Sequence, residues 1–444
     1  MESQGTVSTP IQLITSPFVR FAQMEAAGGI VLLASTVVAL IWANSPWQHS
    51  YHQLLETKVS VGFGNFVITE NRHEWINDGL MSLFFFLVGL EIKREILVGE
   101  LSSLRRAAFP FVAALGGMIL PALIYLGLTH GANVREGWAI PIATDIAFAL
   151  GVLAFFGTRV PVTLKVFVTA LAIVDDIFAV VVIALFYTAR LDYVSLLIGV
   201  TCIAISLLAN LAGIRNPLVY AIIGIFAWCA VLNSGVHATI AGILLAFTIP
   251  CSTVLDRTRF LQQSRSLLDR LEHVPPNSAD EHSILHTMEQ NVGLAESPLE
   301  RTEHFLQPWV GFLIMPLFAL ANAGVNVSQN LSAAIRHPLT LGVGLGLLIG
   351  KPLGILLFSQ LAVRTGLALP LADVSWRQMF GAACLCGIGF TMSLFVATLA
   401  FQDASLLEAS KIAILLASLI SGIFGGFLIA TSSKQVTQET AVAA

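Results

Sequence analysis

Four ionisable residues lie inside long apolar runs of the sequence, where charges are rare: Asp145, Asp175, Asp176 and Lys351. A charged side chain at the centre of a lipid bilayer costs roughly 2.5–3.5 kcal/mol, so such residues mark ion or proton paths by default. The alternative is a static ion pair that locks two helices together. Such a pair could explain Asp175 with Lys351, but it leaves Asp145 and Asp176 without a cationic partner.

The chemistry of these groups favours a small, hard cation. Carboxylates and the neighbouring Thr144 hydroxyl are hard oxygen ligands, poorly suited to soft metals. Asp175 and Asp176 are adjacent, so on a helix they point about 100° apart and need not share one task. Close carboxylates raise each other's proton affinity, whereas a bound cation favours the ionised form. Protons and a cation would therefore compete for one site, which is the minimum requirement for exchange.

The composition indicates which elements must position these residues. Of the 444 residues, 56% are hydrophobic and only 11% are charged, and the mean hydropathy is +0.81. A soluble domain usually has about 25% charged residues, so a cytosolic enzyme and a disordered protein are excluded. The formal net charge of −4 offers no basic surface for nucleic acid. The composition predicts an all-α polytopic membrane protein.

Apolar stretches between turn and charge signals predict about twelve membrane spans. The division between the seventh and eighth spans rests on Asn233-Ser234-Gly235, which must split one long run. The predicted spans are 26–43, 76–96, 107–129, 138–156, 162–188, 193–212, 217–233, 236–250, 308–324, 340–362, 378–400 and 409–430.

Two of these spans carry signals of a break in the helix. Pro141 precedes Ala143-Thr144-Asp145 in span four, and Gly387-Ile388-Gly389 lies in the middle of span eleven. Proline removes a backbone donor, and paired glycines permit unwinding. Ordinary membrane use of Gly and Pro is the alternative for each break alone. Broken helices at membrane depth are tolerated where they line a cavity, so the pair of breaks indicates an ion site.

The distribution of Lys and Arg orients the chain. If the N-terminus is cytoplasmic, sixteen of them lie at cytoplasmic ends and loops, and five lie outside: Lys58, Arg72, Arg135, Arg190 and Arg336. The positive-inside rule then places both termini in the cytoplasm.

The chain divides into a cytoplasmic segment at 1–25, a transmembrane domain at 26–431 and a cytoplasmic tail at 432–444. A polar cytoplasmic insert at 256–307 contains 14 of the 50 charged residues and predicts short helices around Pro275-Pro276. Residues 57–69 predict an outer β-hairpin with a turn at Gly64-Asn65, with an irregular loop as the alternative.

Several motifs together resemble the NhaA sodium/proton antiporters over residues 18–431. They are WINDGLMSLFFFLVGLEIKREI (75–96), ATDIAFALGVLAFFG (143–157), ALAIVDDIFAVVVIALFYT (170–188), NSGVHATIAG (233–242), PLFALANAGV (316–325), GKPLG (350–354) and CGIGFTMSLF (386–395). The resemblance implies inverted repeats with two discontinuous helices, spans four and eleven.

The resemblance also implies roles for individual residues. Asp176 would be the main ligand of the transported Na⁺, with Asp175 beside it as a proton carrier or as the partner of Lys351. Asp145 and Lys351 would offset the facing ends of the broken helices, with Thr144 close by, and Asp78 would lie on the ion or proton path. Six residues match positions linked to pH response, with a solvated membrane boundary as the alternative: Glu91, Arg94, Glu95, His237, Glu303 and His304.

The sequence departs from the family pattern in three places. Ile177-Phe178 follows the Asp pair where many members have Leu-Gly, so the local packing must differ. The family's RLEH element is Arg301-Thr302-Glu303-His304 here, and Gln307 stands where a His is common. A second copy, Arg270-Leu271-Glu272-His273, leaves open which one responds to pH.

The expected function is therefore secondary active transport, not an enzymatic reaction. The protein would export Na⁺ and Li⁺ in exchange for H⁺, contribute to sodium and pH homeostasis, and require no cofactor beyond the transported ions. The resemblance adds electrogenic, pH-regulated exchange by a homodimer that joins through the outer hairpin, in the lipid of a bacterial inner membrane.

Two other classes of protein remain as alternatives. A cation channel also lines its path with carboxylates. An intramembrane aspartate-dependent enzyme is less favoured, because no GxGD element occurs and Ala179 interrupts a DDxxD pattern.

Overall fold

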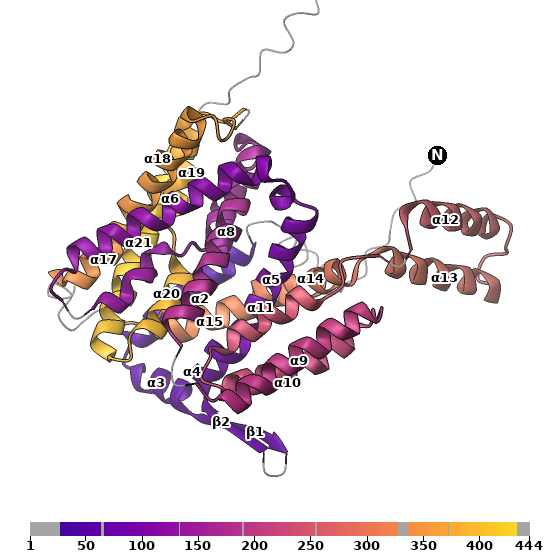
Figure 1. Ribbon diagram of the computed structural model, residues 1–444, viewed down its shortest axis with the longest axis horizontal. Helices are drawn as coiled ribbons and strands as arrows, with labels where there is room; N and C mark the ends of the chain where they lie inside the picture. The colour runs from indigo at the N-terminus through magenta and orange to yellow at the C-terminus, as the bar shows by residue number, and fades with distance from the viewer. Residues whose placement is uncertain are drawn as a thin grey trace, which may run out of the picture. The chain divides into compact units, whose positions relative to one another are not determined.

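The protein is described from a computed structural model that covers residues 27–63, 66–132, 134–188, 191–253, 255–326, 336–371 and 373–432. The predicted terminal segments, apart from residue 432, and the predicted Gly64-Asn65 turn lie outside these residues. Within them, seven helices are long and apolar enough to cross a membrane, or up to nine if two bent helix pairs each form one span (Figure 1). The predicted helical membrane fold is confirmed.

Two compact units make up the chain, and each is built from segments distant in sequence. The first unit contains the N-terminal part as far as Leu80, residues Glu100–Tyr187 and the C-terminal part from Gly311. Its elements are α2 (Ala27–Ala43), α3 (Gln48–Glu56), β1 (Lys58–Phe63), β2 (Phe66–Asn71), α4 (Arg72–Glu74), η1 (Trp75–Leu80), η2 (Glu100–Ser102), α6 (Leu104–Leu128), η3 (Arg135–Ile142), α7 (Ile146–Phe155), η4 (Gly157–Arg159), α8 (Val162–Phe186), η5 (Val310–Ile314), α15 (Met315–Asn322), α17 (Pro338–Leu345), η6 (Gly346–Gly350), α18 (Lys351–Arg364), α19 (Trp376–Leu385), α20 (Phe390–Ala400) and α21 (Ala404–Ala430).

The core of the first unit forms around α6, which packs against α8, α17 and α18. Gly116 of α6 and Gly354 of α18 allow a close approach, because a Cβ on Gly354 would lie 2.0 Å from the carbonyl oxygen of Gly116. Glycine at such a crossing lets two backbones meet, a common feature of membrane helix packing. The contact fixes the start of α18, where Lys351 lies.

Both predicted breaks are present. Residues 143–145 interrupt span four between η3 and α7, and residues 386–389 interrupt span eleven between α19 and α20, which are bent by 43°. Neither Gly387 nor Gly389 adopts a positive φ. Glycine is required at both positions because a larger residue would clash with its neighbours. A Cβ on Gly389 would lie 2.1 Å from Ser393 Oγ, and one on Gly387 would lie 2.7 Å from the Leu347 carbonyl oxygen.

The hairpin pairs β1 with β2 in antiparallel register, with Lys58 opposite Asn71 and Phe63 opposite Phe66. The strands therefore enclose a two-residue connection, so the structure contains a hairpin and not an irregular loop. Asn71 ends β2 and caps α4, where its side chain accepts from Glu74 N while the Glu74 carboxylate accepts from Asn71 N. This capping box turns the chain directly into the helix that carries Asp78.

The second unit contains α5 (Met81–Leu97), α9 (Tyr193–Leu211), α10 (Pro217–Asn233), α11 (Ala238–Thr248), α12 (Arg257–Glu272), α13 (Ala279–Ala295) and α14 (Pro298–Trp309). Helix α11 packs against α5, α9 and α10. Gly235, at φ +81°, separates α10 from α11. The predicted split at Asn233-Ser234-Gly235 is thus confirmed, because only a residue that tolerates the left-handed region can end the helix there.

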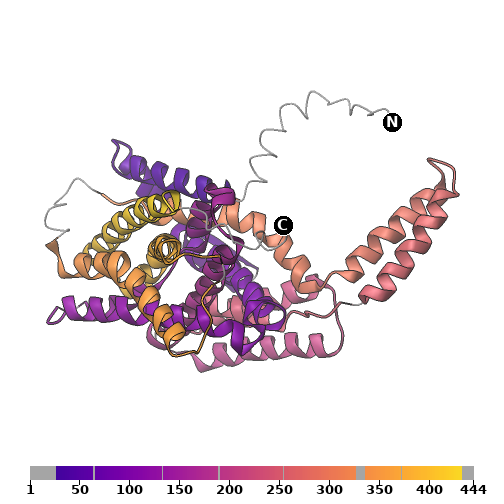
Figure 2. The same ribbon diagram turned by 90° about the horizontal axis from the view of Figure 1, so that it is seen from above.

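The polar insert forms longer helices than the sequence suggested. Helices α12 and α13 lie side by side as an antiparallel pair (Figures 1 and 2). Leu267 and Ile284 are buried in the pair. The predicted end of the insert at 307 differs from the structure, because a capping box between Ser297 and Glu300 starts α14 at Pro298. From there the chain continues as one helical span to Asn322.

Candidate ion-binding site

Asp175 and Lys351 form an ion pair whose two side chains are both 0% exposed. Lys351 Nζ lies 2.8 Å from Asp175 Oδ2. The same oxygen accepts a hydrogen bond from Thr144 Oγ1 at 2.7 Å. The other oxygen of Asp175, Oδ1, has no hydrogen-bond partner among the described residues. One face of this carboxylate is therefore held in place, while the other can accept a proton or a cation.

Asp145 caps two helices with one carboxylate. Its Oδ1 accepts from Phe148 N at 3.0 Å, in the first turn of α7. Its Oδ2 accepts from Thr391 N at 3.0 Å and Thr391 Oγ1 at 2.5 Å, in the first turn of α20. Helix N-termini carry partial positive charge, so the carboxylate stabilises both half-helices at once. The sequence offers Asp145 no cationic partner, and the dipoles of the two helix N-termini compensate its negative charge instead.

The two breaks are also joined directly through their backbones. Asp145 N donates to the Ile388 carbonyl oxygen at 2.7 Å. Thr144 Oγ1 lies 3.2 Å from the carbonyl oxygen of Cys386, the residue that directly follows α19. Lys351 Nζ donates to the carbonyl oxygen of Ile142, the last residue of η3. The lysine therefore lies at the negative end of one half-helix, and Asp145 lies at the positive ends of two.

Asp176 follows Asp175 on α8 and is 1% exposed. Successive helix positions are turned by about 100°, so the two carboxylates face different neighbours. No three His, Cys, Asp or Glu side chains converge as a metal site within the described ranges. Asp175 and Asp176 can therefore supply only part of a cation's coordination, and hydroxyl, carbonyl or water oxygens would have to supply the rest.

Three contributors to the site were not identified from the sequence. Thr391 donates to Asp145, and the Gly116–Gly354 contact positions Lys351. Thr391 is a polar residue two positions after the Gly387–Gly389 break, which is a usable signal for a capping role. The glycine contact joins helices that are distant in sequence, and no local pattern predicts it.

The departure at Ile177-Phe178 has a packing explanation. The ring of Phe178 on α8 packs against Phe111 on α6, with ring centroids 6.0 Å apart. The larger side chain thus fills space between the helix of the Asp pair and the helix that meets α18. Asp78, predicted to lie on the ion path, is half-buried in η1 of the same unit.

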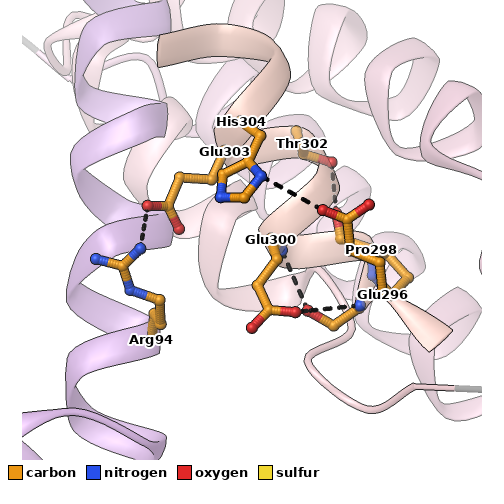
Figure 3. A network of polar contacts seen from close by, with 8 residues as sticks. Arg94, Glu296, Pro298, Glu300, Thr302, Glu303 and His304 are labelled. Atoms are coloured by element: carbon orange, nitrogen blue, oxygen red, sulfur yellow. Dashed lines mark hydrogen bonds and ion pairs between the residues drawn. The ribbon is translucent and has the colours of Figure 1, made fainter. Parts of the chain in front are cut away.

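All six predicted pH-response residues belong to the second unit, and five of them gather where α5 and α14 meet. Arg94 on α5 forms an ion pair with Glu303 on α14 (Figure 3). Arg94 Nη2 also lies 3.6 Å from Glu95 Oε1. Glu91 is close enough to Glu303 to repel it electrostatically. His304 Nδ1 lies 3.4 Å from an oxygen of Glu296. The structure therefore places a mixed-charge cluster between α5 and α14.

The sixth residue, His237, precedes α11 at Ala238. The opposite end of α11 is held by Lys93, which donates to the carbonyl oxygens of Phe247 and Ile249. Since Lys93 is next to Arg94, the length of α11, about 15 Å, separates His237 from the cluster. His237 does not belong to it.

The two copies of the RLEH-like element have different surroundings. Glu303, in the second copy, is 3% exposed and paired with Arg94. The first copy ends α12, and there Glu272 and His273 are exposed. Only the copy at 301–304 lies against α5.

Comparisons with known proteins agree with this geometry. The family model described as "Na+/H+ antiporter 1" matches residues 19–429. The chain is 56% identical over 441 residues to the Na(+)/H(+) antiporter NhaA of Koribacter versatilis, covering 99% of this chain and 97% of the relative. It is 48% identical to the NhaA of Oleidesulfovibrio alaskensis, covering 96% of each, and 44% identical to that of Rhodospirillum rubrum, covering 97% and 100%.

These matches extend over nearly the whole chain and include both broken spans and the Asp pair. They support Na⁺/H⁺ exchange by a multi-pass membrane protein, and they do not support an enzyme or a channel. The chain belongs to the NhaA family of Na⁺/H⁺ antiporters.

Proposed function

We propose that Asp176 is the main ligand of the transported Na⁺, and that Asp175 binds the proton that Na⁺ displaces. The observation that carries this proposal is that only one oxygen of the Asp175 carboxylate is hydrogen-bonded. Lys351 and Thr144 both bind its Oδ2, while Oδ1 has no hydrogen-bond partner within the described part of the chain. A proton or a cation arriving at Oδ1 or at Asp176 would change the charge balance around Lys351.

The exchange cycle follows from competition at this site. Protons would bind from outside and leave to the cytoplasm, and the deprotonated carboxylates would then take Na⁺ outward. Asp145 and Lys351 would hold the half-helix ends in place throughout. Activity would rise with pH, because deprotonation creates the cation site. Exchange of more protons than Na⁺ would be electrogenic, and Li⁺ would be accepted because it has the same preference for oxygen ligands.

The remaining proposals concern the protein in its membrane. The cluster around Arg94 and Glu303 would set the pH response, because its carboxylates and His304 change the local charge. Both termini would face the cytoplasm of a bacterial inner membrane, with Asp78 on the outer part of the path. The β1–β2 hairpin would join two copies in a homodimer surrounded by lipid.

Proton movement in everted membrane vesicles tests the assignment. Adding NaCl or LiCl to energised wild-type vesicles should dissipate part of the proton gradient. Asp176→Asn should abolish this response because the negative charge of the Na⁺ ligand is lost. Asp192→Asn is a matched control, since Asp192 caps α9 at a helix end and asparagine caps equally well. Normal exchange by Asp176→Asn would refute the assignment, and Na⁺ flux without proton counterflow would indicate a channel.

A further inference from the structure

A polar pocket of about 230 Å³ lies in the first unit, where α3, α4 and α21 meet. It is separate from the aspartate pair and plays no part in the exchange cycle described above. Its polar lining consists of Tyr51, His52, Glu56, Asn71, His73 and Lys411.

Lys411 is the unusual member of this lining. It lies in the apolar helix α21 and is 8% exposed. No hydrogen bond or ion pair within the described ranges involves its ammonium group. Glu408, one turn earlier, acts on it only as a nearby charge, and Glu56 lines the same pocket without pairing with it. A buried ammonium without a partner is costly, so a group that compensated its charge would stabilise the folded protein.

The neighbouring histidine does not add a second positive charge. Asn322 Nδ2 donates to Asn77 Oδ1 at 2.8 Å, so Asn322 Oδ1 is the acceptor facing His73 Nε2 at 3.0 Å. His73 therefore donates from Nε2, as a neutral imidazole does. Burial and the charge of Lys411 both lower the pKa of His73, which keeps the ring neutral at physiological pH. His73 therefore adds no positive charge to that of Lys411 in the interior of the pocket.

We propose that this pocket binds a small monovalent anion, with chloride as the probe of that class. Lys411 supplies the charge, and Asn71 supplies a neutral donor. The Oδ1 of Asn71 is occupied as the cap of α4, and its side-chain amide also donates to the Glu74 carboxylate, so one of the two Nδ2 hydrogens is left for an anion. The volume holds an anion with several waters, since a water occupies about 30 Å³. A divalent anion fits less well, because only one positive charge faces it and Glu56 lies at the exposed rim.

The pocket is connected to the segment that carries Asp78. The hydrogen bonds from His73 through Asn322 reach Asn77, which directly precedes Asp78. A bound anion would neutralise Lys411 and stabilise the junction of α3, α4 and α21. It would thereby hold this segment without entering the cation site.

Thermal unfolding of the purified protein in detergent tests the proposal in choline salts, which exclude Na⁺. At constant ionic strength, replacing gluconate by chloride should raise the unfolding temperature in a saturable manner. Lys411→Met should lose this dependence, and Lys58→Met, which removes an exposed lysine of β1, should keep it. Asn71→Asp retains the helix cap but adds a negative charge, and it should raise the half-saturating chloride concentration at least about tenfold. This variant keeps the test valid even if Lys411→Met does not fold.

A bromide-soaked crystal provides the direct measurement, with an anomalous peak expected at Lys411 Nζ. Three results would overturn the proposal: no peak at this position, equal chloride dependence in Lys411→Met, or unchanged chloride affinity in Asn71→Asp. Glu56→Gln separates the remaining explanation. If wild type shows no chloride response, and Glu56→Gln lowers the unfolding temperature in gluconate but makes it depend on chloride, Lys411 pairs with Glu56 in solution and the pocket is not an anion site.

Discussion

The Asp175–Lys351 pair shows how a buried charge can be compensated and still remain available. Both side chains are fully buried, and Thr144 and the Ile142 carbonyl oxygen provide further hydrogen bonds. These additional hydrogen bonds are required because the desolvation of two charges can cost more free energy than their mutual attraction returns. The pair is therefore not in itself evidence of high stability, but the loss of one partner is expected to be costly.

Lys351→Met should reduce stability markedly, because it leaves Asp175 as an uncompensated buried charge. Removing one partner of a buried pair typically costs about 3–5 kcal/mol. The change should be visible as a lower unfolding temperature in detergent. The double variant Lys351→Met/Asp175→Asn should recover much of this loss, since neither charge remains. If the double variant is less stable than the single one, the pair is not the source of the effect.

Glu70 and Glu74 at the base of the hairpin form a second coupled pair, outside the membrane spans. A hydrogen bond with Glu74, together with burial and the charge of Glu74, raises the pKa of Glu70 to about 7. The same hydrogen bond lowers the pKa of Glu74. In the folded protein at pH 6, Glu70 is therefore protonated and donates to the ionised Glu74.

The stability of the hairpin should fall as the pH rises toward and above 7. Glu70 binds its proton more tightly in the folded state than in the unfolded state, so the stabilisation is lost as the pH rises through the folded pKa. Hydrogen exchange of the β1–β2 amides, corrected for intrinsic rates, should become faster between pH 6 and pH 8. Glu70→Gln donates at every pH and should remove this change. An equal change in that variant would exclude the pair as its cause.

At the level of elements, the two broken spans act as one structure. Asp145 caps both α7 and α20, and Asp145 N binds the Ile388 carbonyl oxygen in the other break. Each half-helix would otherwise end in the membrane interior with unsatisfied N–H groups. The breaks therefore persist because each supplies the hydrogen-bond partners of the other.

Asp145→Ala should destabilise the protein more than Asp145→Asn does. Alanine removes the side-chain acceptor of two helix caps, each worth about 0.5–2 kcal/mol, whereas asparagine retains one acceptor oxygen. Unfolding temperatures of the two variants in detergent provide the comparison. Thr391→Val, which removes only the hydroxyl donor to Asp145, should have the smallest effect. Equal losses for alanine and asparagine would mean that charge, and not capping, is what matters.

For the molecule as a whole, the polar insert contains a helical hairpin, α12 and α13, that is stabilised mainly by contacts between its own two helices. Leu267 of α12 and Ile284 of α13 are buried against the partner helix of the pair. Leu255 N donates to the Leu294 carbonyl oxygen at 2.9 Å, so the two ends of the hairpin already meet. The Ser297–Glu300 capping box then starts α14 independently of the α12–α13 helical hairpin.

Deleting residues 257–295 should therefore leave the unfolding temperature within about 2 °C of wild type and preserve Na⁺-dependent proton release. The ends can be joined with little strain, because they are hydrogen-bonded in the intact protein. Deleting residues 257–300 is the matched control. It also removes the cap of α14 and should reduce the yield of folded protein. Loss of exchange in the shorter deletion would show that the insert acts in transport.

The sequence alone determined the membrane fold and identified most residues of the candidate site. Scarce charge in long apolar runs identified Asp145, Asp175, Asp176 and Lys351, because burial of charge in lipid is too costly to be accidental. Pro141 and Gly387–Gly389 located both breaks, and Gly235 located the turn between α10 and α11. These features are local, so the order of residues carries them.

Only the tertiary structure decided which charges compensate each other. Asp175 lies 176 positions from Lys351, and Thr391 reaches Asp145 across 246 positions. The 301–304 copy, and not the copy at 270–273, meets Arg94, while His237 lies at the other end of α11. Such contacts depend on where helices cross, for example at Gly116 and Gly354, and the free energy of a crossing comes from packing between segments that share no local pattern.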